Sequence, residues 1–311
     1  MQRVVPLPVR QGPACRACAE TLAPHQRVAI RGVDTELYRC PQCGLFEFPE
    51  PDWLDAAYSD PIADIDVGLA SRCVMLSGVI EAIVRAERLG GERLLDYGGG
   101  LGLLTRLCRD RGLDMRQYEP MAANLFAQGL EASPKSDFAV VSLVEVFEHL
   151  TDPLDVLSLL SEKAELVIVS TELVPAGLDD LTKWHYLVPD LGQHVTFYTV
   201  DALRRLAQQT GYQLTTDGRG LHVFSRKTLS RRARAVLNRP RLAPVLAKVQ
   251  RRRDHAGSFT LADAAAIQEA ANGAKGAVAD NGASAVLLAR GRRSGGPATG
   301  SHRPTYKRSE V

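Results

Sequence analysis

A glycine-rich turn between an apolar run and an amphipathic one places the strongest constraint on how this chain can fold. The run Leu94-Leu95-Asp96-Tyr97 is followed by four glycines among residues 98–102. Glycine weakens the interior of a helix or strand, but it permits tight turns and a close approach of the backbone to another group. The stretch therefore predicts a strand, a loop of bare backbone and a helix, in that order.

Strand and helix signals alternate along residues 71–225. Short apolar runs predict strands, and apolar residues at helical spacing predict helices. The expected helices are 71–89, 101–111, 153–163, with Pro153 at its first position, and 200–210. The expected strands are 93–97, 113–118, 138–144 and 166–170. Two more strands, 212–216 and 221–225, form a hairpin around Asp217-Gly218. This order is typical of the α/β class, with a doubly wound, mostly parallel sheet, finished here by an antiparallel pair.

The spacing of the glycines distinguishes between two kinds of cofactor. A dinucleotide fingerprint needs G-x-G-x-x-G after the strand. In the two possible registers, Leu103 or Leu101 occupies a position that must be glycine. The register that fits is D-x-G-x-G-x-G, and its members are Asp96, Gly98, Gly100 and Gly102.

This register resembles motif I of the class I S-adenosylmethionine-dependent methyltransferases, whose fold is Rossmann-like. The resemblance implies that the loop binds S-adenosylmethionine. Glu119 follows the next predicted strand, where a carboxylate can accept hydrogen bonds from ribose hydroxyls. Taken alone, the loop also fits a simple strand–helix turn, and Glu119 fits an exposed acid at a strand end.

The stretch VVSLVEVFEHLTDPL is similar to the fourth-strand motif of many such methyltransferases. Glu145, Glu148 and His149 stand at its characteristic positions. In the family, residues leaving this strand line the adenine and methionine end of the cofactor, so the resemblance implies that Glu145 contacts it. Two departures from the family pattern are present: Ala139 replaces a common Asp, and the preceding third strand is nearly lost between Glu119 and Phe138.

Two C-x2-C motifs precede the α/β region. Cys15 and Cys18 form the first, Cys40 and Cys43 form the second, and 21 residues separate the pairs. Two residues between thiolates let a tight turn direct both at one ion. The doubled motif favours a structural zinc site over a redox pair or two unrelated turns. Residues 1–50 are thus predicted to be a zinc ribbon, and residues 51–90 a helical connector with a short helix at 53–58.

The whole layout is similar to that of the deoxysugar C-methyltransferases. These enzymes pair a cysteine-rich N-terminal domain with the methyltransferase core and carry a W-x-Y-x-x-P-x-x-G-Q-H segment, here residues 184–194. Their Glu-His pair, whose His is linked to proton abstraction, corresponds to Gln193-His194. The resemblance covers residues 15–225 and implies a small-molecule acceptor, namely a sugar, sugar nucleotide or glycan precursor. It leaves O-, C- and N-methylation open.

Methyl transfer to a hydroxyl usually needs a base. His194 is the first candidate, His149 is the second, and Glu148 is the expected helper, because an imidazole titrates near neutral pH. Each side chain also fits a hydrogen-bonded structural role. Trp184 and Tyr186 are interpreted either as stacking groups for a sugar or as core residues.

The charge of the chain is divided. Residues 226–311 hold 18 basic and 5 acidic residues, a net charge of +13, whereas the remainder carries −11. We interpret 226–311 as a basic, partly disordered tail. Its residues 226–253 can form short amphipathic pieces on an anionic membrane surface, and a solvated tail without a partner is the alternative. Nucleic acid is a less favoured partner, because nothing in the tail specifies bases.

Two other classes of function remain open. An RNA methyltransferase would fit the ribbon, the core and the basic tail, but the ribbon between Cys18 and Cys40 is not notably basic. A non-catalytic zinc-ribbon protein is disfavoured by the intact glycine motif. No apolar run approaches the ~20 residues that span a bilayer, and residues 1–13 show no secretory signal. A cytoplasmic enzyme that can lie at the inner face of the membrane is expected.

Overall fold

The computed structural model describes residues 12–59, 66–254 and 256–269. The chain divides into two compact units, residues 1–263 and residues 264–311. The described part of the second unit, residues 264–269, is helical. Among the helices of the described residues, none is long and apolar enough to cross a membrane.

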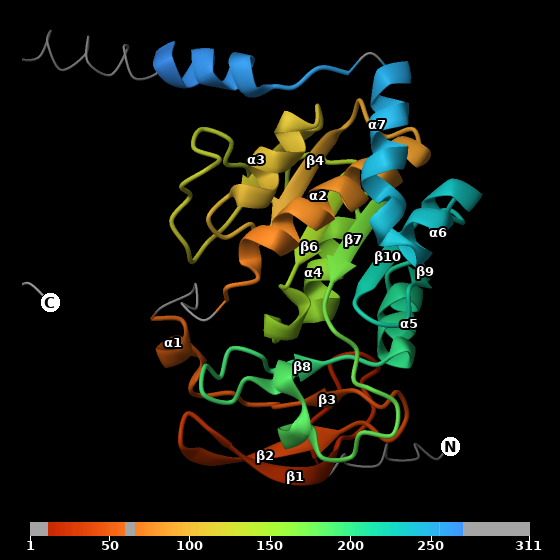
Figure 1. The fold of residues 1–311 in the computed structure, drawn as a ribbon. Helices are drawn as coiled ribbons and strands as arrows, with labels where there is room; N and C mark the ends of the chain where they lie inside the picture. The colour runs from red at the N-terminus through yellow and green to blue at the C-terminus, as the bar shows by residue number, and fades with distance from the viewer. Residues whose placement is uncertain (1–11, 60–65, 255, 270–311) are drawn as a thin grey trace, which may run out of the picture. The chain divides into compact units, whose positions relative to one another are not determined.

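A six-stranded mixed sheet lies at the centre of the first unit (Figure 1). Its order is β5-β4-β6-β7-β10-β9; the first four strands are parallel, and β10 is antiparallel to β7 and β9. The strands are β4 (Arg93–Tyr97), β5 (Asp114–Tyr118), β6 (Val140–Val144), β7 (Leu166–Ser170), β9 (Gln213–Thr216) and β10 (Leu221–Ser225). The predicted doubly wound sheet with a terminal hairpin is confirmed.

The sheet ends at β5. The segment that follows, residues 120–137, adds no further strand and is hydrogen-bonded to the glycine loop. An isolated bridge between Gln117 and Glu131 takes the place of a further strand. The amide groups of Leu125 and Phe126 donate to the carbonyl oxygen of Leu101. The strand that the sequence indicated as nearly lost is therefore replaced by a loop that supports the glycine turn.

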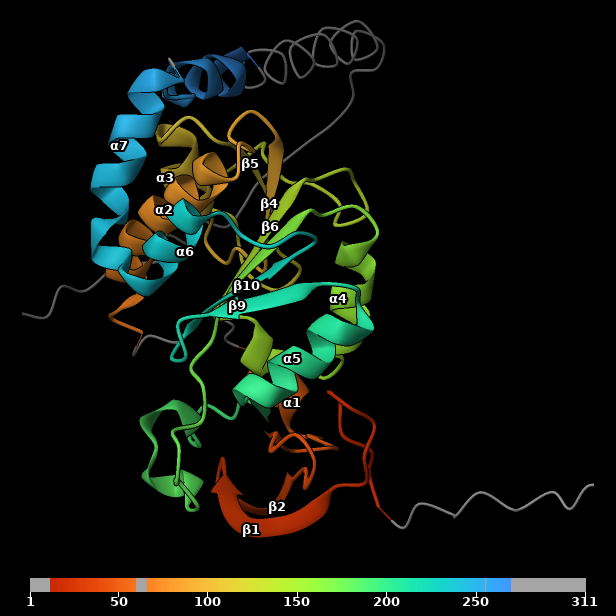
Figure 2. The ribbon, with the colours of Figure 1, turned by 90° about the vertical axis from the view of Figure 1, so that its right-hand side faces the viewer.

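Helices cover both faces of the sheet (Figure 2). Leu94, Val140 and Ile168 point to the face of α2 (Leu69–Ala86) and α3 (Leu103–Asp110), and their neighbours in sequence point to the face of α4 (Pro153–Ser161) and α5 (Val200–Gln209). This alternation is the period of two that a strand imposes on its side chains. Proline lies in the first turn of α4, as predicted, where it needs no amide hydrogen.

The N-terminal residues form a second, smaller sheet in the order β1-β2-β3-β8. Its strands are β1 (Ala23–Ile30), β2 (Val33–Arg39), β3 (Phe46–Glu47) and β8 (Thr196–Phe197), and the connector holds the short helix α1 (Leu54–Ala57). Strand β8 belongs to a segment, residues 172–199, that leaves the central sheet after β7 and reaches the N-terminal one (Figure 1). That segment carries the short 3-10 helices η2 (Leu181–Lys183) and η3 (His185–Leu187), while η1 (Phe147–His149) follows β6. The small sheet thus shares its apolar cluster with residues far along the chain.

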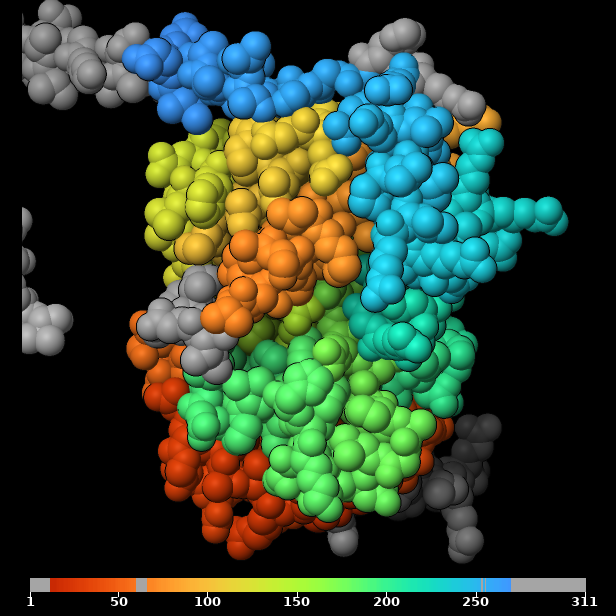
Figure 3. Space-filling model, viewed as in Figure 1, coloured from red at the N-terminus to blue at the C-terminus, as the bar shows by residue number. Residues whose placement is uncertain are grey.

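The segment after β10 packs on α2 (Figure 3). It forms α6 (Arg231–Asn238), η4 (Pro240–Leu242) and α7 (Ala243–Arg253). Val236, Leu237 and Ala247 are buried against α2, and Arg251 pairs with the buried Glu81. The compact unit therefore extends to Asp263, beyond the predicted boundary at 225. The rest of the predicted tail, 270–311, lies outside the described residues.

Candidate active site

The glycine loop leaves the carboxyl end of β4 and enters α3. Gly98, Gly100 and Gly102 have φ angles of +72°, +54° and +84°, in the left-handed region that favours glycine. A Cβ atom at Gly98 would lie 2.7 Å from Cγ2 of Val146, and one at Gly102 would lie 2.6 Å from Oε1 of Gln117. At these two positions, protein atoms as well as backbone conformation require glycine.

Asp96 is buried beneath the loop and hydrogen-bonded within the protein. Its Oδ1 accepts a hydrogen bond from Ser142 Oγ at 2.8 Å, and its Oδ2 accepts one from Thr105 Oγ1 at 3.1 Å. Burial raises the pKa of Asp96 to about 6. These bonds join β4 to β6 and α3, so Asp96 supports the loop that it precedes.

Glu119 lies just after β5, and its carboxylate faces the loop. Its Oε2 accepts a hydrogen bond from Gly100 N at 2.8 Å, and its Oε1 accepts from Met121 N at 2.6 Å and Ala122 N at 3.0 Å. A carboxylate offers about four lone-pair sites, so it can accept a further hydrogen bond from a ligand hydroxyl. The fold thus brings together the glycine loop and Glu119, which the sequence predicted separately.

One cavity of about 430 Å³ joins the glycine loop to the predicted catalytic histidines. Residues of α2, the loop, the end of β6 and the segment 185–194 all contribute to its wall. Of the predicted site residues, Asp96, Gly98, Gly100, Glu145, His149 and His194 line the cavity, whereas Gly102, Glu119 and Glu148 do not.

Glu145 is held at the wall of this cavity in an unusual backbone conformation. Its φ of +53° is rarely adopted by residues other than glycine, and such strain is concentrated at functional sites. Its carboxylate accepts hydrogen bonds from Ser170 Oγ and, at 3.2 Å, from Tyr186 Oη. Burial raises the pKa of Glu145 to about 7, and repulsion by Glu148 acts in the same direction.

His149 and His194 lie side by side, with ring centroids 4.9 Å apart. The Nδ1 atom of His149 is 3.0 Å from the carbonyl oxygen of Gln193, and that of His194 is 2.6 Å from the carbonyl oxygen of Tyr186. Since a carbonyl oxygen only accepts, each Nδ1 carries the hydrogen, and in the neutral ring Nε2 keeps its lone pair. Burial, with the neighbouring His194, lowers the pKa of His149 to about 3.

Glu148 is fully buried next to the two histidines. Its Oε1 accepts a hydrogen bond from Tyr186 Oη at 2.6 Å. Its Oε2 is also buried and has no hydrogen-bond partner among the described residues. The sequence predicted Glu148 as a helper of the catalytic histidines, and the structure places it beside them. Among the described residues, however, its carboxylate forms no hydrogen bond with either imidazole.

Tyr186 is the residue whose role sequence reasoning missed. Trp184 and Tyr186 are each 7% exposed and pack in the apolar cluster of the small sheet, so the core interpretation is confirmed for both. The hydroxyl of Tyr186 nevertheless binds Glu148, and its carbonyl oxygen orients His194. Because Glu148 lies 38 residues earlier in the chain, no local pattern could have revealed this link.

The four paired cysteines converge in the N-terminal sheet region. Their sulfur atoms lie 3.6 Å apart for Cys15 and Cys43, 3.5 Å for Cys18 and Cys40, and 3.7 Å for Cys18 and Cys43. The amides of Ala17 and Cys43 point at the sulfurs of Cys15 and Cys40. All four thiols are free, and together they could hold one metal ion.

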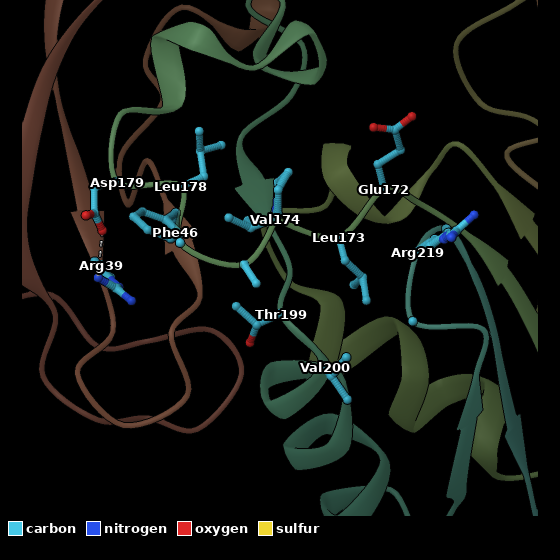
Figure 4. A pocket seen from close by; sticks show the side chains of 15 residues that line it. Arg39, Phe46, Glu172, Leu173, Val174, Leu178, Asp179, Thr199, Val200 and Arg219 are labelled. Carbon is cyan, nitrogen blue, oxygen red and sulfur yellow. Dashed lines mark ion pairs between the residues drawn. The ribbon is translucent and has the colours of Figure 1, made fainter.

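A second cavity, of about 690 Å³, lies along residues 172–179. Figure 4 shows the ion pair of Arg39 and Asp179, 4.0 Å apart, at one side and Arg219 at the other. None of the predicted site residues lines this cavity. Glu172 lines it and lies 3.3 Å from Nε2 of His185, a residue of the first cavity.

Comparisons with solved structures find methyltransferases of low identity. CalO1, a methyltransferase in calicheamicin biosynthesis in its SAH-bound form, is 14% identical with a TM-score of 0.34, over 49% of this chain and 54% of that one. The mitomycin 7-O-methyltransferase MmcR is 15% identical with a TM-score of 0.40, over 55% and 60%. Human N-acetylserotonin methyltransferase is 12% identical with a TM-score of 0.34, over 57% and 66%. The chain thus spans about half to two thirds of these proteins, and such scores do not bear on the acceptor.

A family model agrees with the fold and the loop. Residues 75–217 match the family described as "Methyltransferase domain". A comparison with curated proteins finds no match. The matched region contains the central strands β4 to β7, the D-x-G-x-G-x-G loop and most of the residues that line the cavity beside the loop. Residues 75–217 therefore resemble a methyltransferase domain.

Proposed function

We propose that this enzyme transfers a methyl group from S-adenosylmethionine to a small-molecule acceptor in the 430 Å³ cavity, and that the acceptor is a sugar, sugar nucleotide or glycan precursor. The observation that carries the proposal is the shared cavity, in which the glycine loop and two histidines meet. Methyl transfer from a sulfonium is an in-line displacement, so the protein acts mainly by positioning the two reactants. The similarity of residues 184–194 to deoxysugar C-methyltransferases supports the sugar class.

The loop and Glu119 are proposed to hold the donor. The sulfonium cofactor supplies the methyl group when it is bound. The backbone of residues 98–100 lines the cavity, and the Glu119 carboxylate, already bonded to Gly100 N, has capacity for a ribose hydroxyl. Glu145 lines the same cavity and is proposed as a further contact.

Glu119→Ala tests this assignment directly. We expect the Kd for S-adenosylmethionine, measured by isothermal titration, to rise by about 10–100-fold, because hydrogen bonds to a charged group contribute about 1.5–3 kcal/mol. Glu162→Ala, at an exposed acid at the end of α4, is the control and should bind normally. An unchanged Kd in Glu119→Ala would contradict the ribose role, and wild-type protein that binds NAD but not S-adenosylmethionine would refute the cofactor.

His194 is proposed as the base that removes the acceptor proton. Its ring is partly buried and lines the cavity, and its Nδ1 donates to the carbonyl oxygen of Tyr186. That bond fixes the ring and leaves the Nε2 lone pair to accept a proton. His149 is the second candidate; burial lowers its pKa to about 3, far below the ordinary value, which weakens it as a base near neutral pH.

A structural zinc ion is proposed at Cys15, Cys18, Cys40 and Cys43. Four thiolates about 2.3 Å from a tetrahedral ion lie roughly 3.8 Å from one another, close to the 3.5–3.7 Å between these sulfur atoms. Four protein ligands would close the coordination sphere, so the ion would stabilise the fold and take no part in methyl transfer.

The joint variant Cys40→Ser with Cys43→Ser should lose one zinc ion per chain, measured by elemental analysis of protein purified without chelator. Because metal binding is coupled to folding in so small a region, amide exchange should also increase first in residues 13–22 and 40–45. Cys108→Ala, at a buried cysteine outside the cluster, is the control and should keep its zinc. Equal zinc contents in all three proteins would remove the site.

The outer face of α7 is proposed to contact an anionic membrane surface. Ala243 and Ala247 face α2, and the opposite face exposes Val245 and Val249, which are 64% and 48% exposed. Lys248 is exposed between these two valines. Apolar and basic side chains on one exposed face are typical of helices that lie at a bilayer interface.

The joint variant Val245→Asp with Val249→Asp should reduce cosedimentation with phosphatidylserine vesicles at low salt, because it places two carboxylates at the anionic surface. Its binding of S-adenosylmethionine should be unchanged. Val33→Asp, at a valine of the N-terminal sheet that is 63% exposed, is the matched control. If the joint variant sediments as well as wild type does, α7 is not a membrane contact.

A further inference from the structure

We infer that Glu148, His149 and His194 form a second metal site, for one divalent transition-metal ion such as Zn²⁺ or Co²⁺. One potential ligand atom from each of the three residues lies within 4.8 Å of those from the other two. The site is distinct from the cysteine cluster, and its ligands are two imidazoles and one carboxylate. Such ligands suit Zn²⁺, Co²⁺ and Fe²⁺ better than Mg²⁺ or Ca²⁺, which prefer oxygen ligands alone.

The two imidazoles are held as metal ligands usually are. Histidines that bind a metal through one nitrogen almost always donate the other N–H to a carbonyl or carboxylate, which fixes the ring and its tautomer. Here the Nδ1 of His149 is bonded to the carbonyl oxygen of Gln193, and that of His194 to the carbonyl oxygen of Tyr186. Both Nε2 lone pairs therefore remain for an ion, and both rings line the cavity from which an ion can enter.

The carboxylate of Glu148 supplies an independent reason for a cation. Its side chain is fully buried, and Oε2 has no hydrogen-bond partner among the described residues. Neither Lys nor Arg forms an ion pair with Glu148 in the part of the chain that the structure describes. A buried, unpaired carboxylate is costly, and a bound cation would compensate its charge. The hydrogen bond from Tyr186 to Oε1 orients the carboxylate, as neighbours of metal ligands commonly do.

The geometry requires a small closure of the three side chains. Ligands about 2.1 Å from a tetrahedral ion lie roughly 3.4 Å apart, whereas the three atoms here lie within 4.8 Å of one another. Three protein ligands would leave one position of a tetrahedral ion open, and two of the three, His149 and His194, line the cavity.

A metal ion at this site is not part of the proposed function and would affect it. The ion and the proton of the acceptor would compete for the same Nε2 atom of His194. With the ion bound, that nitrogen could not act as the base. The metal-loaded enzyme is thus a state in which proton transfer to His194 is blocked, and removal of the ion restores the free imidazole.

Cobalt titration of the full-length protein, with the cysteine site already filled with zinc, tests the second site. Co²⁺ bound to nitrogen and oxygen ligands absorbs in the visible range without the thiolate-to-cobalt charge-transfer band that a cysteine site gives. We expect one cobalt ion per chain with this signature in wild type. Glu148→Gln and His149→Ala should each lose it, whereas His185→Ala, at another histidine of the same cavity, should retain it.

The outcomes separate this site from the proposed function. Retention of zinc at the cysteines in every variant would show that the N-terminal region is still folded. No visible cobalt band in wild type, or an equal band in Glu148→Gln and His149→Ala, would overturn the metal site. Binding of S-adenosylmethionine, measured in parallel without cobalt, tests the methyl-donor site alone, so either proposal can fail while the other stands.

Discussion

Gly100→Val abolishes binding of S-adenosylmethionine to the folded enzyme; this is the expected result of an isothermal titration with the purified variant. Gly100 has a φ of +54°, which a β-branched residue rarely adopts, and its backbone lines the cavity. Its amide and carbonyl groups bind Glu119 and Gln117, so a shift of this residue also displaces the proposed ribose contact. We expect the Kd to rise beyond the measurable range.

Gly177→Val is the matched control for backbone strain. Gly177 has a φ of +77°, and a Cβ atom there would meet nothing within 4 Å. It lies on the segment 172–179, away from the glycine loop. Normal binding in this variant, together with an unchanged circular dichroism spectrum of Gly100→Val, would attribute the loss to the loop. Tight binding by Gly100→Val would show that the cofactor does not use the loop.

His194→Ala should lower turnover by about 10²–10⁴-fold, which is the usual contribution of general acid–base catalysis. The affinity for S-adenosylmethionine should barely change, because His194 faces the proton of the acceptor in the proposed arrangement. The measurement is kcat with an identified acceptor, together with the Kd for the donor. A lower kcat at constant donor affinity indicates an interaction made in the transition state.

The controls for His194→Ala are His149→Ala and His185→Ala, which remove the other two histidines that line the cavity. His149 donates to a different carbonyl oxygen, and burial lowers its pKa to about 3. The His185 side chain is 76% exposed and lies beside Glu172. If His194→Ala turns over as fast as wild type, His194 is not the base. The base is then His149 or His185, whichever residue abolishes turnover when it is replaced by alanine.

The predicted elements of the central sheet were accurate because their signals are local. The strand predicted at 93–97 is β4, and the helix predicted at 200–210 is α5 to within one residue. Side-chain alternation, glycine φ preferences and a proline in the first helical turn each depend on a few neighbouring residues. The glycine loop belongs to this class, so its position and register followed from the sequence.

The N-terminal strands were not predicted because tertiary contacts create them. Strands β3 and β8 have two residues each and pair with one another across about 150 positions of the chain. Glu47 of β3 is fully buried and pairs with Arg16. No local pattern marks a charged residue as buried when its partner is supplied from another part of the fold.

The basic segment after residue 225 shows how context reverses an interpretation. Pro240 lies in the first turn of η4 and Pro244 in the first turn of α7, where proline is tolerated. Arg251, part of a basic run, pairs with the buried carboxylate of Glu81. Charge density alone cannot distinguish a solvated run from one that neutralises a buried acid.

The sequence by itself determined the α/β class, the cofactor register of Asp96, Gly98, Gly100 and Gly102, and the pairing of cysteines into two motifs, since each is a property of spacing along the chain. Only the tertiary structure decided that the rings of His149 and His194 meet edge to face, and that Glu148 lies buried next to them with one carboxylate oxygen that has no hydrogen-bond partner among the described residues. These contacts join residues 45 positions apart. They depend on how the segment after β7 returns past the end of β6, which packing of the whole unit determines.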